Sequence, residues 1–219
     1  DDSSHWCVEF GAWDGRHLSN TFLLVESHYW NAIYIEGDPE KFRALQETAR
    51  DISKIQPVLS MVGDTKGSAL DELLAETDCP RDYDLLSIDI DSSDLDVWVR
   101  HTDYRPSVVV IEINSGIPPG ILQWHNKKTQ GNSFSATMRV ADSKEYTLVC
   151  HTGNLIFVKS ELADRMDLDE VDLEFPERLF IWDWVGVAQG LSVKDRFIHA
   201  GSRLPQSVKR PANKILKRK

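Results

Sequence analysis

Short apolar runs alternate with amphipathic stretches along most of the chain. The apolar runs predict strands at residues 6–10, 32–36, 56–62, 84–89, 107–113, 146–151 and 154–159. The stretches between them predict helices at residues 19–29, 40–51, 68–77, a segment ending at Trp98, and 133–143. Regular alternation of strands and helices is typical of βαβ units, which build a mostly parallel sheet.

The last two predicted strands differ from the others because only Thr152-Gly153 separates them. A turn this short joins antiparallel neighbours, whereas parallel strands need a longer crossover. The run at residues 107–113 is almost entirely apolar, as expected of a strand covered on both faces. The pattern therefore predicts an α/β fold: a seven-stranded, mostly parallel sheet with an antiparallel final strand and helices on both faces.

The composition is that of a soluble globular chain. Hydrophobic residues make up 41% and charged residues 27% of the 219 residues. No apolar run approaches the roughly 20 residues that span a bilayer, so no transmembrane segment is expected. The three cysteines show no paired spacing, which favours free thiols in a reducing compartment and hence a cytoplasmic protein. We expect one domain over residues 1–200 and a basic tail over residues 201–219.

Charge is distributed unevenly along the chain. The net charge is −10, yet residues 194–219 hold nine Lys or Arg against one Asp, so that segment is near +8 and the remainder near −18. An acidic body argues against nucleic acid as a partner, because phosphate contacts need Lys and Arg. A small-molecule or glycan acceptor is the expected partner. The basic segment is either a solvated end or a contact for an anionic polymer, another subunit or a membrane surface.

Residues placed to bind a nucleotide follow the first three predicted strands. Glu9-Phe10-Gly11-Ala12-Trp13-Asp14-Gly15 is a glycine-containing turn, which lets the backbone approach a ligand closely. Glu36-Gly37 comes about 20 residues later, where a carboxylate can accept both hydroxyls of a ribose. Asp64 either meets an adenine amine or caps the next helix. Nicotinamide enzymes prefer Gly-x-Gly-x-x-Gly, and position 13 is Trp here.

A second group of polar residues follows strands four and five. Asp89 and Asp91 come after the fourth strand, and Glu112 and Asn114 after the fifth. Oxygen ligands from adjacent strand ends could hold Mg²⁺, which would orient a substrate hydroxyl and lower its pKa. Without a metal, Asp89 and Asp91 are candidate general bases.

A candidate base also lies in the long loop after strand five. His125 belongs to the loop over residues 114–132, which is long enough to be a substrate lid. His101 and His151 are further candidates, although their positions are more typical of a helix end and a strand end. The aromatic run at residues 179–184 either covers a pocket, forms a homodimer face or packs in the core.

The series Glu9-x-Gly11-x-x-x-Gly15, Glu36, Asp64 and Asp89 resembles the motifs of class I S-adenosylmethionine (SAM)-dependent methyltransferases, which have a Rossmann-like fold. Val8–Ala12, Tyr34–Pro39, Leu85–Asp91 and Val110–Glu112 resemble the FkbM-type family among them. The chain departs from that family at Trp13-Asp14-Gly15 and at Asp91-Ser92. The resemblance implies a SAM site made by Glu9, Gly11, Ala12, Trp13, Gly15, Glu36, Gly37, Asp64 and Asp89.

The resemblance further implies an O-methyltransferase that acts on a hydroxyl of a sugar, a glycan or a secondary metabolite. Two other functions remain open at this point. Asp89-Ile90-Asp91 is an Asp-x-Asp sequence that could serve a metal-dependent glycosyltransferase. The chain could also be a non-catalytic nucleotide-binding domain, because a fold that binds a nucleotide does not by itself imply catalysis.

Overall fold

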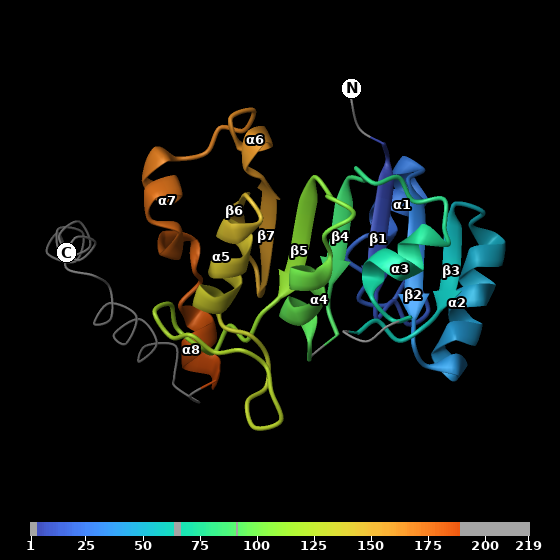
Figure 1. The fold of residues 1–219 in the computed structure, drawn as a ribbon, viewed down its shortest axis with the longest axis horizontal. Coiled ribbons are helices and arrows are strands. Elements are labelled where there is room, and N and C mark those ends of the chain that lie inside the picture. The colour runs from blue at the N-terminus through green and yellow to red at the C-terminus, as the bar shows by residue number, and fades with distance from the viewer. Residues whose placement is uncertain (1–3, 64–66, 91, 189–219) are drawn as a thin grey trace, which may run out of the picture.

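The structure, a computed structural model, describes residues 4–63, 67–90 and 92–188, and contains one seven-stranded sheet. The strands are β1 (Trp6–Phe10), β2 (Asn31–Glu36), β3 (Ile55–Leu59), β4 (Leu85–Ile88), β5 (Val108–Glu112), β6 (Tyr146–His151) and β7 (Asn154–Lys159). Their order in the sheet is β3-β2-β1-β4-β5-β7-β6 (Figure 1). Strand β7 is antiparallel to both of its neighbours, β5 and β6, and the other six strands all run in one direction. The predicted mostly parallel sheet with an antiparallel final strand is confirmed.

Helices cover both faces of the sheet. The helices are α1 (Phe22–His28), α2 (Pro39–Asp51), α3 (Leu70–Ala75), α4 (Asp94–Arg100), α5 (Phe134–Ser143), α6 (Ser160–Ala163), α7 (Glu170–Glu174), the 3-10 helix η1 (Pro176–Leu179) and α8 (Asp183–Ala188). Alternate strand residues point to opposite faces, so Val8 belongs to one buried cluster and Cys7 to the other. The Val8 cluster includes residues of α3, α4 and α5, whereas the Cys7 cluster includes residues of α1 and α2.

Local sequence signals explain where α2 begins. The Asp38 side chain accepts hydrogen bonds from the backbone N–H groups of Glu40 and Lys41, and these bonds lower the pKa of Asp38. Pro39 occupies the first helical turn, where the N–H that it lacks has no helical partner. This start leaves only Gly37 and Asp38 between Glu36, the last residue of β2, and the helix.

Two predicted boundaries lie three residues from the observed ones, and the others differ by at most two. Strand β3 ends at Leu59 rather than at residue 62, and Met61 and Val62 line a cavity instead. Helix α1 begins at Phe22 rather than at residue 19. The buried Glu9 carboxylate holds the backbone before α1 by accepting hydrogen bonds from the N–H groups of Asn20 and Thr21, so this segment forms a turn.

The three cysteines lie in the described part of the chain and form no disulfide there. Cys7 and Cys79 are buried free thiols, and burial raises the pKa of each to about 12. Cys150 is half-buried. No helix within residues 4–188, as far as they are described, is long and apolar enough to cross a membrane. The predicted domain end at residue 200 and the basic tail lie outside the described residues.

Candidate functional site

Two cavities open at the carboxyl ends of the parallel strands. Strand order reverses between β1 and β4, and ligands of open α/β sheets bind outside the carboxyl ends of strands at such a point. The first cavity, of about 210 Å³, is here called the Glu36 cavity. Its lining residues follow β1, β2, β3 and β4: Phe10, Gly11, Ile35, Glu36, Gly37, Ser60, Met61, Val62, Ile90, Ser92 and Ser93.

Glu36 is the only carboxylate among the described residues that line this cavity. One carboxylate oxygen, Oε2, accepts the backbone N–H of Trp13 at 2.8 Å, and the other, Oε1, accepts that of Asp38 at 2.8 Å. These bonds fix the side chain between the loops after β1 and β2. Since a carboxylate oxygen has more than one lone pair, each oxygen can still accept a hydrogen bond from a hydroxyl group of a ligand.

Two glycines leave room where the loops approach the cavity. Gly11 has φ +73°, and a Cβ atom there would lie 2.7 Å from the carbonyl oxygen of Asp89. A Cβ atom at Gly37 would overlap the Met61 side chain. The loops after β1 and β4 can therefore pack this closely only around a glycine at position 11, whereas at Gly37 the exposed Met61 side chain could move aside. Such a cradle at the first βα turn suits the close approach of a nucleotide.

The other predicted residues of the first loop have structural contacts. Glu9 is 5% exposed, and its carboxylate accepts hydrogen bonds from Ser19 and Thr21 as well as from the backbone before α1. Burial raises the pKa of Glu9 despite these bonds. Gly15 packs against Leu45 and Tyr34, and Ala12 is buried.

Trp13 is exposed to 43% and adopts a left-handed φ of 48°. Its ring lies below the Lys41 ammonium, which is 5.2 Å from the ring centroid. None of Glu9, Ala12, Trp13 and Gly15 is among the residues that line the Glu36 cavity. Asp64, the predicted adenine contact, lies outside the described residues.

The second cavity, of about 390 Å³, lies at the ends of β5 and of the β6–β7 hairpin and is here called the Glu112 cavity. It is lined by Asp94, Glu112, Ile113, Asn114, Ser115, Gly116, Gln130, Gly131, Gly153, Asn154 and Trp184. The long loop between β5 and α5 runs along the same edge as α8 (Figure 1). Asp94 connects the two cavities, because its carboxylate accepts the backbone N–H groups of Ile90 and Ser92 from the Glu36 cavity.

A buried histidine supports the wall of the Glu112 cavity. The backbone N–H of Ile181 donates to Nδ1 of His151 at 2.9 Å, so a neutral His151 carries its proton on Nε2. That Nε2–H donates to Ser115 Oγ at 2.8 Å, and the Ser115 hydroxyl donates to the Gly153 carbonyl at 3.0 Å. The His151 ring also stacks on Phe180, with ring centroids 4.7 Å apart. Burial lowers the pKa of His151 from 6.5 to about 4.

This pKa predicts that His151 makes folding stability depend on pH. Between pH 6.5 and pH 4 the unfolded chain protonates His151 while the folded chain does not, so stability falls as the pH decreases through this range. The full loss amounts to about 3 kcal/mol and is complete below pH 4. Urea unfolding at a series of pH values measures it.

The control for this prediction is His151→Gln, because a glutamine amide can make both hydrogen bonds but does not titrate in this range. Other groups titrate in both proteins, so the difference between wild type and variant isolates His151. We expect that difference to shift by about 3 kcal/mol between pH 7 and pH 4. A difference that does not change with pH would contradict the assignment.

Of the remaining predicted catalytic and metal-binding residues, Glu112 and Asn114 both line the Glu112 cavity, whereas Asp89 and His125 do not. Nδ1 of His125 accepts the backbone N–H of Gly131 at 3.2 Å, and His125 does not line the Glu112 cavity. The Asn114 amide bonds within its own loop, to Gln130 and Gly116. Asp91 lies outside the described residues, and the rest contain no group of three or more His, Cys, Asp or Glu that could hold a metal ion.

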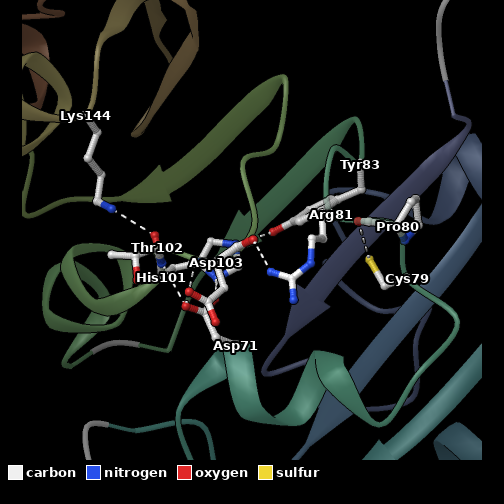
Figure 2. A network of polar contacts seen from close by, with 9 residues as sticks. All are labelled: Asp71, Cys79, Pro80, Arg81, Tyr83, His101, Thr102, Asp103 and Lys144. Carbon is white, nitrogen blue, oxygen red and sulfur yellow. Dashed lines mark hydrogen bonds and ion pairs between the residues drawn. The ribbon is translucent and has the colours of Figure 1, made fainter.

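His101 lies near the amino ends of the parallel strands, away from the cavities, and takes part in a buried polar network (Figure 2). Its Nδ1 pairs with Asp71, and its Nε2 bonds to the Tyr83 hydroxyl at 2.9 Å. Burial alone would raise the pKa of Asp71, but the bonds from His101 and two backbone N–H groups lower it to about 2. Because Tyr83 precedes β4, this network links α3, α4 and the amino end of the sheet and is remote from both cavities.

Several residues of the Glu112 cavity were not predicted from the sequence. Ser115, Gly153 and Trp184 are examples, and they come from three separate segments. One available signal was the turn at Thr152-Gly153, because β6 runs parallel to β5 and its turn must therefore lie at the same edge as the end of β5. The aromatic run at residues 179–184 was predicted to cover a pocket or to pack. It does both, because Phe180 is buried and Trp184 lines the cavity.

No family model matches the sequence, and no curated protein matches it either. Among solved structures, M. capricolum TrmK in complex with S-adenosylhomocysteine (SAH) is 12% identical with a TM-score of 0.50, and the match covers 97% of this chain and 88% of TrmK. The N-terminal domain of EvdMO1, with SAH and D-fucose, is 9% identical with a TM-score of 0.46 over 70% of this chain and 75% of that domain.

The M. jannaschii protein TYW2, in complex with AdoMet, is 12% identical with a TM-score of 0.42 over 70% of this chain and 65% of TYW2. At these identities the likeness to TrmK concerns the fold. The fold class is thus the Rossmann-like fold found in class I methyltransferases, with its seven-stranded sheet and β7 antiparallel to its neighbours.

Proposed function

We propose that this protein is a SAM-dependent methyltransferase that transfers the methyl group to a hydroxyl of a small-molecule or glycan acceptor. The observation that carries the proposal is the Glu36 cavity, which combines a fixed carboxylate with the glycine cradle of Gly11 and Gly37. The likeness to TrmK, whose structure contains SAH, supports the same cofactor. The FkbM-type resemblance of the loops supports a sugar-like acceptor.

In this proposal the Glu36 cavity binds the cofactor and the Glu112 cavity binds the acceptor. When bound, SAM supplies an electrophilic methyl group on a sulfonium centre. Glu36 holds the ribose, and Gly11 lets the backbone approach the cofactor. The acceptor occupies the Glu112 cavity, and Asp94 fixes the loop between the two sites. Positioning contributes most to such a transfer, and a base is needed only for a weakly acidic hydroxyl. Asp89, Asp91 and His125 were predicted as that base, but neither Asp89 nor His125 is among the residues that line the Glu112 cavity.

Calorimetric titration with SAM, SAH and NAD tests the proposal. We expect both sulfur nucleotides to bind with dissociation constants on the order of micromolar, and NAD to bind at least about a hundredfold more weakly. The reason is that the Glu36 cavity follows a loop that lacks the Gly-x-Gly-x-x-Gly spacing of nicotinamide enzymes. Tighter binding of NAD would favour an oxidoreductase. If none of SAM, SAH and NAD binds, the proposal is contradicted, and only the likeness in fold remains.

A further inference from the structure

A groove runs along α5 at the β6 end of the sheet, beside α7 and η1 (Figure 1). It consists of two cavities, of about 380 and 430 Å³, which share the lining residues Met138, Asp142 and Pro176. We call it the α5 groove. It shares no lining residue with the Glu36 and Glu112 cavities, so it is separate from the proposed cofactor and acceptor sites.

The floor of the α5 groove is apolar. Met138 is only partly buried, and Leu173 of α7 is 47% exposed. The other large apolar side chains of the lining are Phe134, Tyr146, Leu148 and Trp182. Apolar surface that is open to water in this way favours a partner that also carries apolar side chains.

Four carboxylates also line the groove, and its described lining contains no Lys, Arg or His. Two of them already have cationic partners, because Asp172 pairs with Arg178 and Glu145 with Arg105. The carboxylates of the other two, Asp142 and Glu177, make no hydrogen bond or ion pair with any described residue. Loss of hydration raises the pKa of Asp142, as expected of a carboxylate that lacks a compensating cation.

The segment that follows α8 has the complementary composition. Residues 194–219 contain nine Lys or Arg against one Asp, so their net charge is near +8. The same segment also contains six large apolar residues, Phe197, Ile198, Leu204, Val208, Ile215 and Leu216. A chain segment that is both basic and apolar matches a groove with an apolar floor and acidic walls.

The connection is long enough for this segment to reach the groove of its own chain. Trp182 lines the groove and directly precedes α8, whose six residues rise by about 9 Å. The next five residues, 189–193, can span about 17 Å when extended. Residue 194 can therefore lie again beside Trp182, at the entrance of the groove.

From these observations we infer that the basic segment over residues 194–219 docks in the α5 groove of its own chain. Its Lys and Arg side chains lie against Asp142 and Glu177, and its apolar side chains cover Met138 and Leu173. This inference goes beyond the proposed function and does not depend on it. It assigns an intramolecular contact to a segment whose composition would also suit an anionic polymer, a membrane surface or a second subunit.

Cross-linking of the full chain with a carbodiimide tests the inference, because this reagent joins a Lys ammonium to a carboxylate in contact with it. The sample is an equal mixture of unlabelled and ¹⁵N-labelled protein, and mass spectrometry identifies the linked peptides. We expect Lys residues of 194–219 to be linked to Asp142 or Glu177, with both peptides of each pair carrying the same isotope.

Three results would overturn the inference. Mixed-isotope pairs in the proportion expected from random pairing would assign the groove to the segment of a second copy. Links spread evenly over carboxylates of the whole surface would show non-specific attraction by a segment of opposite charge. An absence of links from residues 194–219 to the groove would leave its occupant unassigned and the intramolecular contact wrong.

Limited digestion of the full chain with trypsin gives a second test. Asp142→Asn combined with Glu177→Gln is expected to accelerate cleavage within residues 194–219 at least about threefold at low salt, because each surface ion pair contributes a few tenths of a kcal/mol and cleavage follows the released population. High salt should remove the difference between this variant and wild type.

The matched control is Glu40→Gln combined with Glu47→Gln, which removes the same charge from exposed positions on α2, outside the groove. It should leave the cleavage rate unchanged. Circular dichroism establishes that both double variants are folded. Equal rates in wild type and the groove variant, or the same acceleration in the control, would contradict docking at Asp142 and Glu177.

Discussion

Replacement of Glu36 by alanine is expected to weaken SAM binding by at least about a hundredfold. The Glu36 side chain is 6% exposed and fixed by two backbone N–H groups, so its carboxylate is already oriented when a ribose arrives. Hydrogen bonds to a charged group contribute about 1.5–3 kcal/mol each, and two ribose hydroxyls together account for about 3 kcal/mol or more. Calorimetry with SAM and SAH measures the loss.

The matched control is Glu40→Ala, which removes an exposed carboxylate from the first turn of α2. It should leave SAM affinity within about twofold of wild type, because surface charges at this distance are screened. Circular dichroism and thermal unfolding establish that both variants are folded. Unchanged SAM affinity in a folded Glu36→Ala protein would remove the ribose assignment.

Gly11→Ala is expected to destabilise the protein by about 3 kcal/mol or more. The left-handed φ of +73° costs an alanine about 1–2 kcal/mol. The new Cβ atom would also lie 2.7 Å from the carbonyl oxygen of Asp89, which is backbone and cannot rotate away. Relief of this overlap must move the loop after β4 and costs about 1–3 kcal/mol more. Urea unfolding measures the change.

Gly67→Ala is the control that separates the backbone strain of a left-handed φ from the steric overlap of the new Cβ atom. Gly67 has φ +85°, but a Cβ atom there would meet no atom of the described residues within 4 Å. We expect this control to lose only the conformational part, about 1–2 kcal/mol. Equal losses in the two variants would show that the packing of Gly11 against Asp89 adds nothing. A Gly11→Ala protein with wild-type stability would contradict the described loop geometry.

Three of the nine residues that the sequence predicts for the cofactor line the Glu36 cavity, and their positions were predictable. Gly11, Glu36 and Gly37 each follow a strand directly, and the carboxyl ends of parallel strands meet at one edge, so their convergence follows from the strand pattern. The role of Glu9 was not predictable. Sequence shows a carboxylate near the loop, but only the folded chain shows that it accepts hydrogen bonds from the turn before α1.

The lining of the Glu112 cavity could not be predicted without the tertiary structure. His151, Ser115 and Trp184 are separated by more than 30 residues from one another, and their meeting depends on how the β6–β7 hairpin, the loop after β5 and α8 pack. No local periodicity encodes such contacts. The predicted set of Asp89, Asp91, Glu112 and Asn114 illustrates the same point: Glu112 and Asn114 line the Glu112 cavity, but Asp89 does not.

The sequence by itself determined the strands, their mostly parallel arrangement and the loops that carry Gly11 and Glu36, because hydrophobic periodicity and glycine turns are local properties of the chain. Only the tertiary structure decided which carboxylates face a cavity and which serve the fold, as Glu36 and Glu9 show. It also decided the tautomer of His151 and the acceptor character of Ser115, since each depends on hydrogen-bond partners that lie far away in the sequence.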